Sequence, residues 1–417
     1  MVTMKKPPEV SGVQNPGEES RGNYILTING GSSSIRFAVF ETGAKMLPRL
    51  DGKLDRIGMS GGKFSVNSSE QKLRTSQELR VPNANSAISF IVAWLEDHGV
   101  LDSVKAVGHR IVHGMEHSDP ERITPKLLDD LREIIQYDPK HLPAEIEFIE
   151  AIGKRYPKVP QVACFDTAFH RTMPRNATLL AIPRRFDAKG IRRYGFHGLS
   201  YEYLVSELAR LGDPTATKGR LILAHLGNGA SLTAVRDGKS IDTSMGFTPS
   251  SGIMMGTRSG DLDPGLMSYL SRNERMSPAR FQKMVTSESG LLGVSDLSSD
   301  MQSLLEQEGN DVRASEAVEL FCYQAKKWIG AFTAALGGVD AIIFTGGIGE
   351  NAPVVRERIC NGLGYLGIEL NRKRNAMGAP TISRSNGRVK VRVIRTDEEQ
   401  MIARSVCRIL SLGKESN

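Results

Sequence analysis

The first clear pattern of hydrophobic and polar positions surrounds a run of small residues, 30–34. Apolar residues stand before this run and recur at every second position after it: Ile25, Leu26 and Ile28, then Ile35, Phe37 and Val39. The pattern predicts two strands joined by a tight turn. Because Gly and Ser leave backbone N–H groups and hydroxyls uncovered, the turn is a candidate phosphate-binding hairpin. A flexible turn without a ligand is the plainer alternative.

The same pattern returns at residues 221–244. An apolar segment leads into a small, polar break that contains Gly227, Asn228, Gly229 and Ser231, and an alternating segment follows. Two such hairpins about two hundred residues apart predict a duplicated domain whose two turns face one another across a cleft. Chance similarity of two hairpins is the alternative.

A third break, within residues 341–359, differs in kind. A continuous apolar segment enters "TGGIGEN" and a helical pattern leaves it, with Asn351 as the expected helix cap and Pro353 in the first turn. Such a strand-turn-helix junction lets a ligand approach the helix N-terminus. Elsewhere strand-like and helix-like segments alternate, which is typical of mixed α/β architecture, and residues 314–336 read as a core or interface helix.

Composition narrows the class of protein. With 417 residues, 40% hydrophobic and 24% charged, the chain resembles an average globular protein of two domains. The 54 Lys and Arg are dispersed among 47 Asp and Glu, so the net charge of +7 indicates no nucleic-acid partner and fits an enzyme that handles anions. No apolar run reaches the roughly 18 residues of a membrane span. Residues 1–23 are rich in Pro, Gly, Glu and Ser and predict a disordered tail.

The spacing of the cysteines indicates the redox state of the cellular compartment. The four cysteines are far apart in the sequence and have neither metal-ligand spacing nor a dense disulfide pattern: Cys164, Cys322, Cys360 and Cys407. We therefore expect a reducing, cytoplasmic setting.

Several motifs are decoys. Gly238, Lys239 and Ser240 look like the end of a P-loop, but Thr233 stands where that motif needs its first Gly, and Asp237 with Gly238 predicts an ordinary hairpin turn.

A second apparent motif has the spacing of a dinucleotide fingerprint, at Gly362, Gly364 and Gly367, but it follows a helical segment instead of a strand. A nicotinamide oxidoreductase is kept only as a rival. Three histidines four residues apart, His109, His113 and His117, suggest metal ligands on a helix, yet their neighbouring glycines predict an extended segment.

Polar residues in loops of small residues carry the stronger signal. Arg110, Asp166, His197, Arg258 and Asp261 all lie in such loops. Together they supply cations, carboxylates and an imidazole beside three candidate phosphate turns. That is the set of groups required for phosphoryl transfer.

These residues also carry a resemblance. The segments "NGGSSS", "GHRIVHG", "FDTAFHRTMP", "RRYGFHG", "HLGNGAS", "DTSMGFTP", "MGTRSGD", "FTGGIGEN" and "TDEE" occur in the order found in the acetate, propionate and butyrate kinase family. The chain resembles this family from about Tyr24 to its C-terminus. The resemblance implies a duplicated actin-like (ribonuclease H-like) α/β fold with an interdomain cleft. Residues 24–166 and 396–417 would form the first domain, and 167–395 the second, which would bind the nucleotide and form a homodimer.

The resemblance also implies the site residues. The catalytic positions are Asp166, His197 and Arg258. The acid would bind to Arg110, beside Val112, Phe196 and Pro249. Asn29 and Glu398 would hold Mg²⁺, for which Mn²⁺ can substitute. ATP or ADP would contact Ser32, Ser34, Arg36, His225, Leu226, Gly227, Asn228, Gly229, Asp300, Met301, Gln302, Gly346, Gly347, Ile348, Gly349 and Glu350.

The implied reaction is the reversible transfer of the γ-phosphoryl group of ATP to acetate, giving acetyl phosphate and ADP. Because a carboxylate acceptor is already ionised at neutral pH, Asp166 is not required as a base and would position metal-bound water or an arginine. The alternative is a propionate or other short-chain acyl kinase with relaxed donor specificity. A non-catalytic nucleotide-binding protein of actin-like fold is a rival that the intact catalytic positions disfavour.

The chain departs from the family pattern at a few positions. Arg36 replaces a Lys, and Gln302 replaces an Arg near the nucleotide. Around His141 the family usually has Leu before and Asn after, whereas this chain has Lys140 and Leu142. These differences bear on donor and acid preference.

Overall fold

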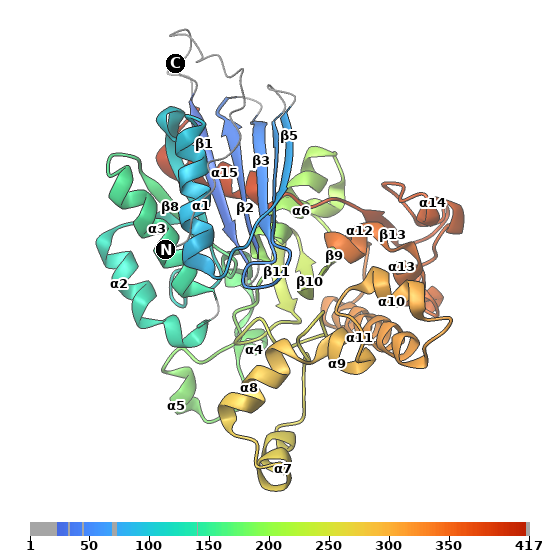
Figure 1. Cartoon of the computed structure of the whole chain (residues 1–417). Helices are drawn as coiled ribbons and strands as arrows, with labels where there is room; N and C mark the ends of the chain where they lie inside the picture. The colour runs from blue at the N-terminus through green and yellow to red at the C-terminus, as the bar shows by residue number, and fades with distance from the viewer. Residues whose placement is uncertain (1–22, 32–33, 44–45, 69–72, 140, 414–417) are drawn as a thin grey trace.

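The computed structural model describes residues 23–31, 34–43, 46–68, 73–139 and 141–413, which form two β-sheets flanked by helices (Figure 1). The predicted tail at residues 1–22, Ser32 of the first turn and Lys140 lie outside the described residues, so the expectations for them stay predictions.

The first sheet has the strand order β5-β4-β3-β2-β1-β6-β8-β7 within the described residues. Its strands are β1 (Tyr24–Gly30), β2 (Ser34–Glu41), β3 (Leu47–Asp55), β4 (Lys63–Ser68), β5 (Leu73–Glu78), β6 (Val104–Ile111), β7 (Glu121–Arg122) and β8 (Gln161–Phe165). The predicted first hairpin is confirmed, because β1 pairs with β2 antiparallel from Tyr24 opposite Glu41 to Gly30 opposite Ile35.

The second sheet has the order β11-β10-β9-β12-β13. Its strands are β9 (Arg220–Leu226), β10 (Ala230–Arg236), β11 (Lys239–Thr243), β12 (Ala341–Thr345) and β13 (Lys390–Val393). The turn between β10 and β11 is the ordinary hairpin expected from the sequence, with φ of 52° at Asp237 and 77° at Gly238.

The two sheets repeat one topology. In the first, β3, β2 and β1 are antiparallel neighbours, and β6 and then β8 add in parallel. In the second, β11, β10 and β9 are antiparallel neighbours, and β12 and then β13 add in parallel. The sheets therefore confirm the predicted duplication of an actin-like α/β unit.

Helices cover both sheets. They are α1 (Ala84–Asp97), α2 (Pro125–Glu133), α3 (Leu142–Arg155), α4 (Arg175–Thr178), α5 (Arg184–Asp187), α6 (Gly198–Arg210), α7 (Gly265–Asn273), α8 (Pro278–Ser287), α9 (Gly290–Ser295), α10 (Met301–Gln307), α11 (Val312–Leu336), α12 (Gly346–Asn351), α13 (Pro353–Cys360), α14 (Arg372–Ala376) and α15 (Glu398–Leu410). Among the described residues, no helix combines the length and apolar character that a membrane span requires.

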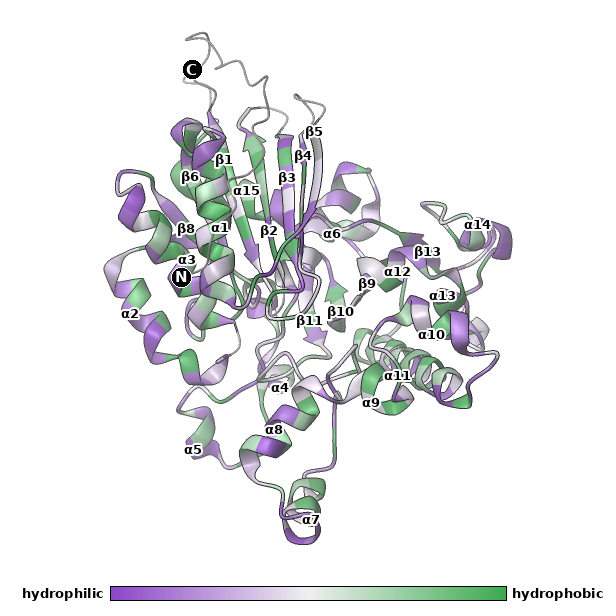
Figure 2. Ribbon diagram, viewed as in Figure 1, coloured by the Kyte–Doolittle hydropathy of each residue, from purple (hydrophilic) through white to green (hydrophobic). Residues whose placement is uncertain are grey.

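The buried faces of these helices explain their positions. Helices α1 and α3 pack their apolar sides on one face of the first sheet, and α15 packs on the other face beside β1 and β6. Helix α11 covers one face of the second sheet and α6 the opposite face. Figure 2 shows hydrophobic strands between helices whose outer sides are more hydrophilic. Helix α15 thus carries the last residues of the chain back to the first strand.

One local expectation is wrong. Asn351 does not cap the helix after the third glycine-rich break, because the helical turn already begins at Gly346, with Thr345 at its N-cap position. Asn351 ends α12 and donates from Nδ2 to the carbonyl of Gly347, 2.9 Å away. The next helix, α13, has Pro353 in its first turn as predicted, but its N-cap position is Ala352.

Candidate active site

The predicted site lies at the turns of the two hairpins, which follow the central strands β1 and β9. At the end of β1, the N–H of Gly31 donates to the carbonyl of Ser34 at 2.7 Å. At the end of β9, the N–H of Gly227 donates to the carbonyl of Gly229 at 3.0 Å. A Cβ on Gly229 would lie 3.3 Å from Nε2 of His197. A side chain at Gly229 would therefore force His197 to shift, and this close approach brings the histidine to the turn.

Arg110 joins the first turn to the predicted catalytic aspartate. From β6 it donates through Nη1 to the carbonyl of Gly30 at 2.8 Å, and through Nε and Nη2 to Oδ2 of Asp166 at 3.1 and 2.5 Å. The Asp166 carboxylate is buried, and its Oδ1 has no hydrogen-bond partner among the described residues. Burial raises the pKa of Asp166, and the Arg110 guanidinium opposes that shift. Asp166 therefore pairs with an arginine, and its role in positioning that arginine or metal-bound water stays a prediction.

Oxygen ligands gather beside this pair. Asn29 at the end of β1 donates from Nδ2 to Glu398 Oε2 at 2.9 Å and to Glu399 Oε1 at 3.1 Å, across 369 and 370 positions of sequence. Burial alone would raise the pKa of Glu398, but neighbouring groups, the Arg110 guanidinium foremost, outweigh burial and lower it. Glu398 is therefore held as a carboxylate, the form in which it can bind a cation. Arg36 pairs with Asn29 in the β1–β2 register, has an exposed side chain, and its charge acts to lower the pKa of both Glu398 and Glu399.

Two histidines stack at the second turn. The His197 and His225 ring centroids are 4.2 Å apart, with an interplanar angle of 18°. His197 precedes α6 with φ of 60°, a left-handed conformation that is uncommon outside Gly, Asn and Asp. Burial, followed by the charge of the neighbouring histidine, lowers the pKa of His197 well below its usual value, and burial also lowers that of His225. Burial therefore favours the uncharged form of both rings.

Arg258 lies on the other side of the second turn. Its Nη1 donates to the carbonyl of Pro249 at 2.9 Å and lies 3.7 Å from the position a Cβ on Gly229 would occupy. Burial lowers the pKa of this guanidinium from its ordinary value, which leaves it charged at neutral pH because arginine starts so high. The guanidinium is thus close to the turn and to a wall of the predicted acid pocket.

Two of the three predicted apolar walls, Val112 and Phe196, belong to one buried cluster. Val112 and Phe196 are buried, at 2% and 1% exposure, and Pro249 is partly buried. Leu142, one of the departures from the family pattern, is the first residue of α3 and is fully buried in the core, whereas His141 donates from Nδ1 to the Asp138 carboxylate at 2.8 Å. Leu142 therefore packs in the core and does not line the cleft.

The nucleoside-side loop is fixed by its own glutamate. Glu350 Oε1 accepts from Thr345 Oγ1 at 3.1 Å and from the N–H of Gly346 at 2.9 Å. Gly346 has φ of 78°, and a Cβ there would lie 2.7 Å from the carbonyl oxygen of Leu226. The loop, with Gly347, Ile348 and Gly349, thus packs directly on the second hairpin and on Gly227.

The segment from Asp300 to Gln302, which is expected near the nucleotide, is exposed at both ends. Asp300 caps α10 by accepting from the N–H of Ser303 at 2.9 Å, and Met301 is buried. Gln302 is exposed and donates to Glu306 at 3.0 Å. Asn228 of the second turn accepts at its carbonyl from the N–H of Gly256 at 3.0 Å, close to this segment.

The three evenly spaced histidines have separate partners. His109 on β6 contacts Gln161 through Nε2 at 2.7 Å, His113 lies 4.6 Å from the Tyr194 ring, and His117 contacts Glu121 at 2.7 Å. Only His109 lies on a strand, and the structure does not bring the three together.

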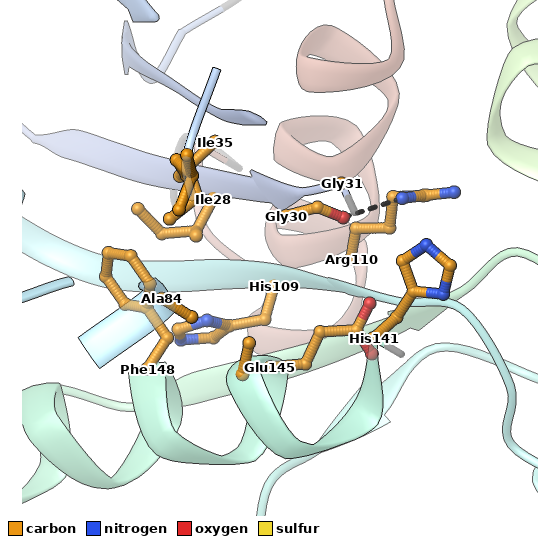
Figure 3. A pocket seen from close by; sticks show the side chains of 12 residues that line it. Ile28, Gly30, Gly31, Ile35, Ala84, His109, Arg110, His141, Glu145 and Phe148 are labelled. Carbon is orange, nitrogen blue, oxygen red and sulfur yellow. Dashed lines mark hydrogen bonds between the residues drawn. The ribbon is translucent and has the colours of Figure 1, made fainter. Parts of the chain in front are cut away.

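Sequence reasoning missed a buried acid beneath Arg110. Glu145 on α3 accepts at Oε2 from the N–H of Val112 at 3.2 Å, while Oε1 has no partner among the described residues. It borders a cavity of about 60 Å³ between α3 and the first sheet (Figure 3), lined also by His109, Arg110 and Phe148. The sequence signal that could have revealed Glu145 is its position among the apolar residues Leu142, Ile146 and Ile149 of the same helix, where an acid is unexpected.

Comparison with known proteins agrees with this geometry. A sequence profile described as the acetokinase family matches residues 24–404. The chain belongs to the acetokinase family. It is 42% identical to an acetate kinase of Rhodopseudomonas palustris, over 94% of this chain and all of that protein. It is also 42% identical to an acetate kinase of Methylocella silvestris, over 93% of this chain and 98% of that protein.

Solved structures of the same family superpose closely. The acetate kinase of Porphyromonas gingivalis gives a TM-score of 0.83 at 37% identity, over 93% of this chain and all of that one. A propionate kinase of Francisella tularensis gives a TM-score of 0.85 at 36% identity, over 92% of this chain and 98% of that one. The match extends over both sheets, so the family relation holds for the whole described fold.

Proposed function

We propose that this member of the acetokinase family transfers the γ-phosphoryl group of ATP reversibly to the carboxylate of acetate, giving acetyl phosphate and ADP. The observation that carries the proposal is the convergence of Arg110, His197 and Arg258 on two glycine turns. Cations and N–H donors placed in this way can bring two anions together and offset charge on the phosphoryl oxygens.

Each group has a role in this scheme. Arg110, oriented by Asp166 and by the carbonyl of Gly30, has guanidinium N–H groups left to bind the acid. The acid's short chain would lie against Val112, Phe196 and Pro249. His197 and Arg258 would donate to the transferring group, and the loop from Gly346 to Glu350 would hold the nucleoside side of ATP or ADP.

The oxygen ligands fit Mg²⁺. Asn29 and Glu398 would hold it, with Mn²⁺ as a substitute, and the unpartnered Oδ1 of Asp166 offers a further acceptor nearby. No set of three or more His, Cys, Asp or Glu side chains in the described part of the chain is arranged to hold a metal. Mg²⁺ commonly takes one or two carboxylates and completes its shell with phosphate and water. When bound, it would neutralise charge on the phosphate oxygens.

The direct experiment is a hydroxamate assay for acyl phosphate with ATP, Mg²⁺ and a series of acids. Acetate is expected to give the highest kcat/KM, propionate a lower value and butyrate a poor one, because each added methylene changes selectivity by about tenfold or somewhat more. A clear preference for butyrate or glycolate would contradict the acetate assignment, and a preference for propionate would favour the alternative suggested by the propionate kinase structure. An absorbance assay for nicotinamide reduction tests the oxidoreductase rival.

We further propose a cytoplasmic homodimer formed through the second half of the chain. Apolar side chains on α11 are exposed, with Leu320 at 37% and Tyr323 at 58%, and a second copy would cover them. The four cysteines are free thiols, which suits a reducing compartment. Light scattering after size exclusion decides between one and two copies.

A further inference from the structure

Both stacked histidines present the same ring nitrogen to the second turn. Nε2 of His197 lies 3.3 Å from the position a Cβ on Gly229 would take, and Nε2 of His225 lies 3.8 Å from the corresponding position on Gly227. The Nδ1 atoms face away from the turn and each contacts a serine at 2.8 Å, Ser231 for His197 and Ser200 for His225.

Each serine has a second hydroxyl partner. Thr396 Oγ1 donates to Ser200 Oγ at 2.9 Å. The Tyr201 hydroxyl is in hydrogen-bond contact with Ser231 Oγ. Ser200, Ser231 and Tyr201 are all 0% exposed, so solvent does not compete for these contacts.

The direction of the hydrogen bonds follows from the number of protons. A hydroxyl has one proton to donate, and a buried donor left without an acceptor destabilises the fold by about 1–3 kcal/mol. If Tyr201 donates to Ser231, then Ser231 must donate to Nδ1 of His197, and every proton is used. Because Thr396 donates to Ser200, the proton of Ser200 is free to go to Nδ1 of His225 in the same way.

We propose that these two hydroxyl relays hold His197 and His225 in the tautomer that carries its proton on Nε2, so that both rings are uncharged N–H donors aimed at the turn. Ser200, Ser231, Tyr201 and Thr396 are then positioning residues, and none of them touches the substrate. The catalytic part of this inference rests on the proposed phosphoryl transfer, whereas the tautomers themselves do not.

The electrostatics of the site agree with this assignment. Arg110 and Arg258 both disfavour a positive charge on His197, and burial lowers the pKa of both histidines. A neutral ring can donate only through the nitrogen that carries its proton. With Nδ1 occupied as an acceptor, Nε2 is that nitrogen.

The relay from Thr396 also reaches the nucleoside-side loop. The N–H of Thr396 points to Glu350 Oε1 at 3.4 Å, and the same oxygen accepts from Gly346. Thr396 thus links the loop that would hold ATP to the histidine at the second turn.

The test is the ¹⁵N spectrum of the imidazoles in the full-length protein labelled at histidine, at neutral pH and without substrate. The signals are assigned with His197→Gln and His225→Gln. Both histidines are expected to show an unprotonated Nδ1 and a protonated Nε2. A proton on Nδ1, or imidazolium signals, would overturn the proposal.

Variants connect the tautomers to turnover. Ser231→Ala and Ser200→Ala are each expected to give mixed tautomers at the partner histidine and to lower kcat by about tenfold or more, with KM values for ATP and acetate within about twofold. Ser231→Thr keeps the hydroxyl and should restore both the spectrum and most of kcat. Ser206→Ala is the matched control and should change neither, because Ser206 lies on the same helix as Ser200 but bonds to the carbonyl of Tyr203 and to Arg404.

The outcomes separate the two proposals. A fall in kcat with unchanged tautomers would assign the loss to packing and overturn the relay. A changed spectrum with normal turnover would overturn the contribution of the tautomers to catalysis. If the resting protein shows the expected tautomers but forms no acyl phosphate from any acid, the proposed function fails while the assignment of the tautomers stands.

Discussion

Arg258 illustrates how much one side chain contributes at this site. Its guanidinium is near the second turn and fixes the carbonyl of Pro249 at 2.9 Å. Arg258→Ala is expected to lower kcat by about two or more orders of magnitude, the scale of losing a charge partner of the transition state. Thermal unfolding should show that the fold survives.

Arg280→Ala serves as the control for this variant. Arg280 is exposed and pairs with Glu288 at 2.5 Å, so its loss should leave turnover unchanged. Near-normal kcat in Arg258→Ala would remove Arg258 from the mechanism.

Gln302 is the residue on which we expect donor preference to depend. It is exposed on α10 and bonded only to Glu306 among the described residues, so it supplies no cation to a nucleotide. We expect this protein to accept GTP with relaxed discrimination, and Gln302→Arg to raise the ratio of kcat/KM for ATP over GTP by about tenfold, the value of one charged hydrogen bond.

The measurement is kcat/KM for ATP, GTP and pyrophosphate in both forms. Gln307→Arg adds the same charge at an exposed position at the end of the same helix and should leave the ratio unchanged. Strict ATP selectivity of the unmodified protein, together with no effect of Gln302→Arg, would refute the interpretation.

At the scale of elements, the junction between β12 and α12 depends on one glycine. Gly346 combines φ of 78° with a close approach to the carbonyl of Leu226. Gly346→Ala should destabilise the junction by about 1–3 kcal/mol and raise KM for ATP while KM for acetate changes little, because Arg110 lies on the other sheet.

Gly330→Ala is the contrasting change. Gly330 lies inside α11 with open space around its Cα, so alanine there should stabilise the helix by about 0.5–1 kcal/mol. Chemical denaturation of both variants measures the difference. Equal stability of Gly346→Ala and the unmodified protein would show that the junction tolerates a Cβ.

Across the whole molecule, buried neutral histidines link stability to pH. Burial lowers the pKa of His109, His113 and His170 to about 4 in the folded state, whereas an unfolded histidine has a pKa of about 6.5. The unfolded chain therefore binds more protons between these values. Stability is complete above about pH 6.5 and falls as the pH drops toward 4, by about 3 kcal/mol for each histidine.

Urea denaturation at several pH values between 7.5 and 4.5 tests this dependence. His170→Gln should reduce the slope, because one titrating group is removed, and His98→Gln should not, because His98 is exposed. A free energy of unfolding that stays constant from pH 7 to pH 5 would contradict the prediction.

Much of the fold and part of the site follow from local patterns. Alternation around Gly30 and around Gly229 predicts both hairpins, because burial of one sheet face imposes a period of two and only small residues fit a turn that approaches other groups. The strand-turn-helix junction at Gly346 is also local, although its cap was assigned wrongly to Asn351. The quoted motifs contain Ser231 and Glu399, and Ser200 lies two residues after "RRYGFHG", but nothing in the sequence distinguishes these three from other small or acidic residues.

The two hairpins, the resemblance to the kinase family and the identity of the charged residues can be inferred from the order of amino acids. Which of these residues meet depends on the folded arrangement of the two sheets: Asn29 contacts Glu398 across 369 positions, Arg110 contacts Asp166 across 56, and Ser200 contacts Thr396 across 196. The physical reason is that periodicity and turn chemistry act between near neighbours, whereas hydrogen bonds and ion pairs depend on distances that only the packing of the two sheets creates. The position of Glu145 beneath Arg110 and the direction of the hydroxyl relays belong to that second kind of information.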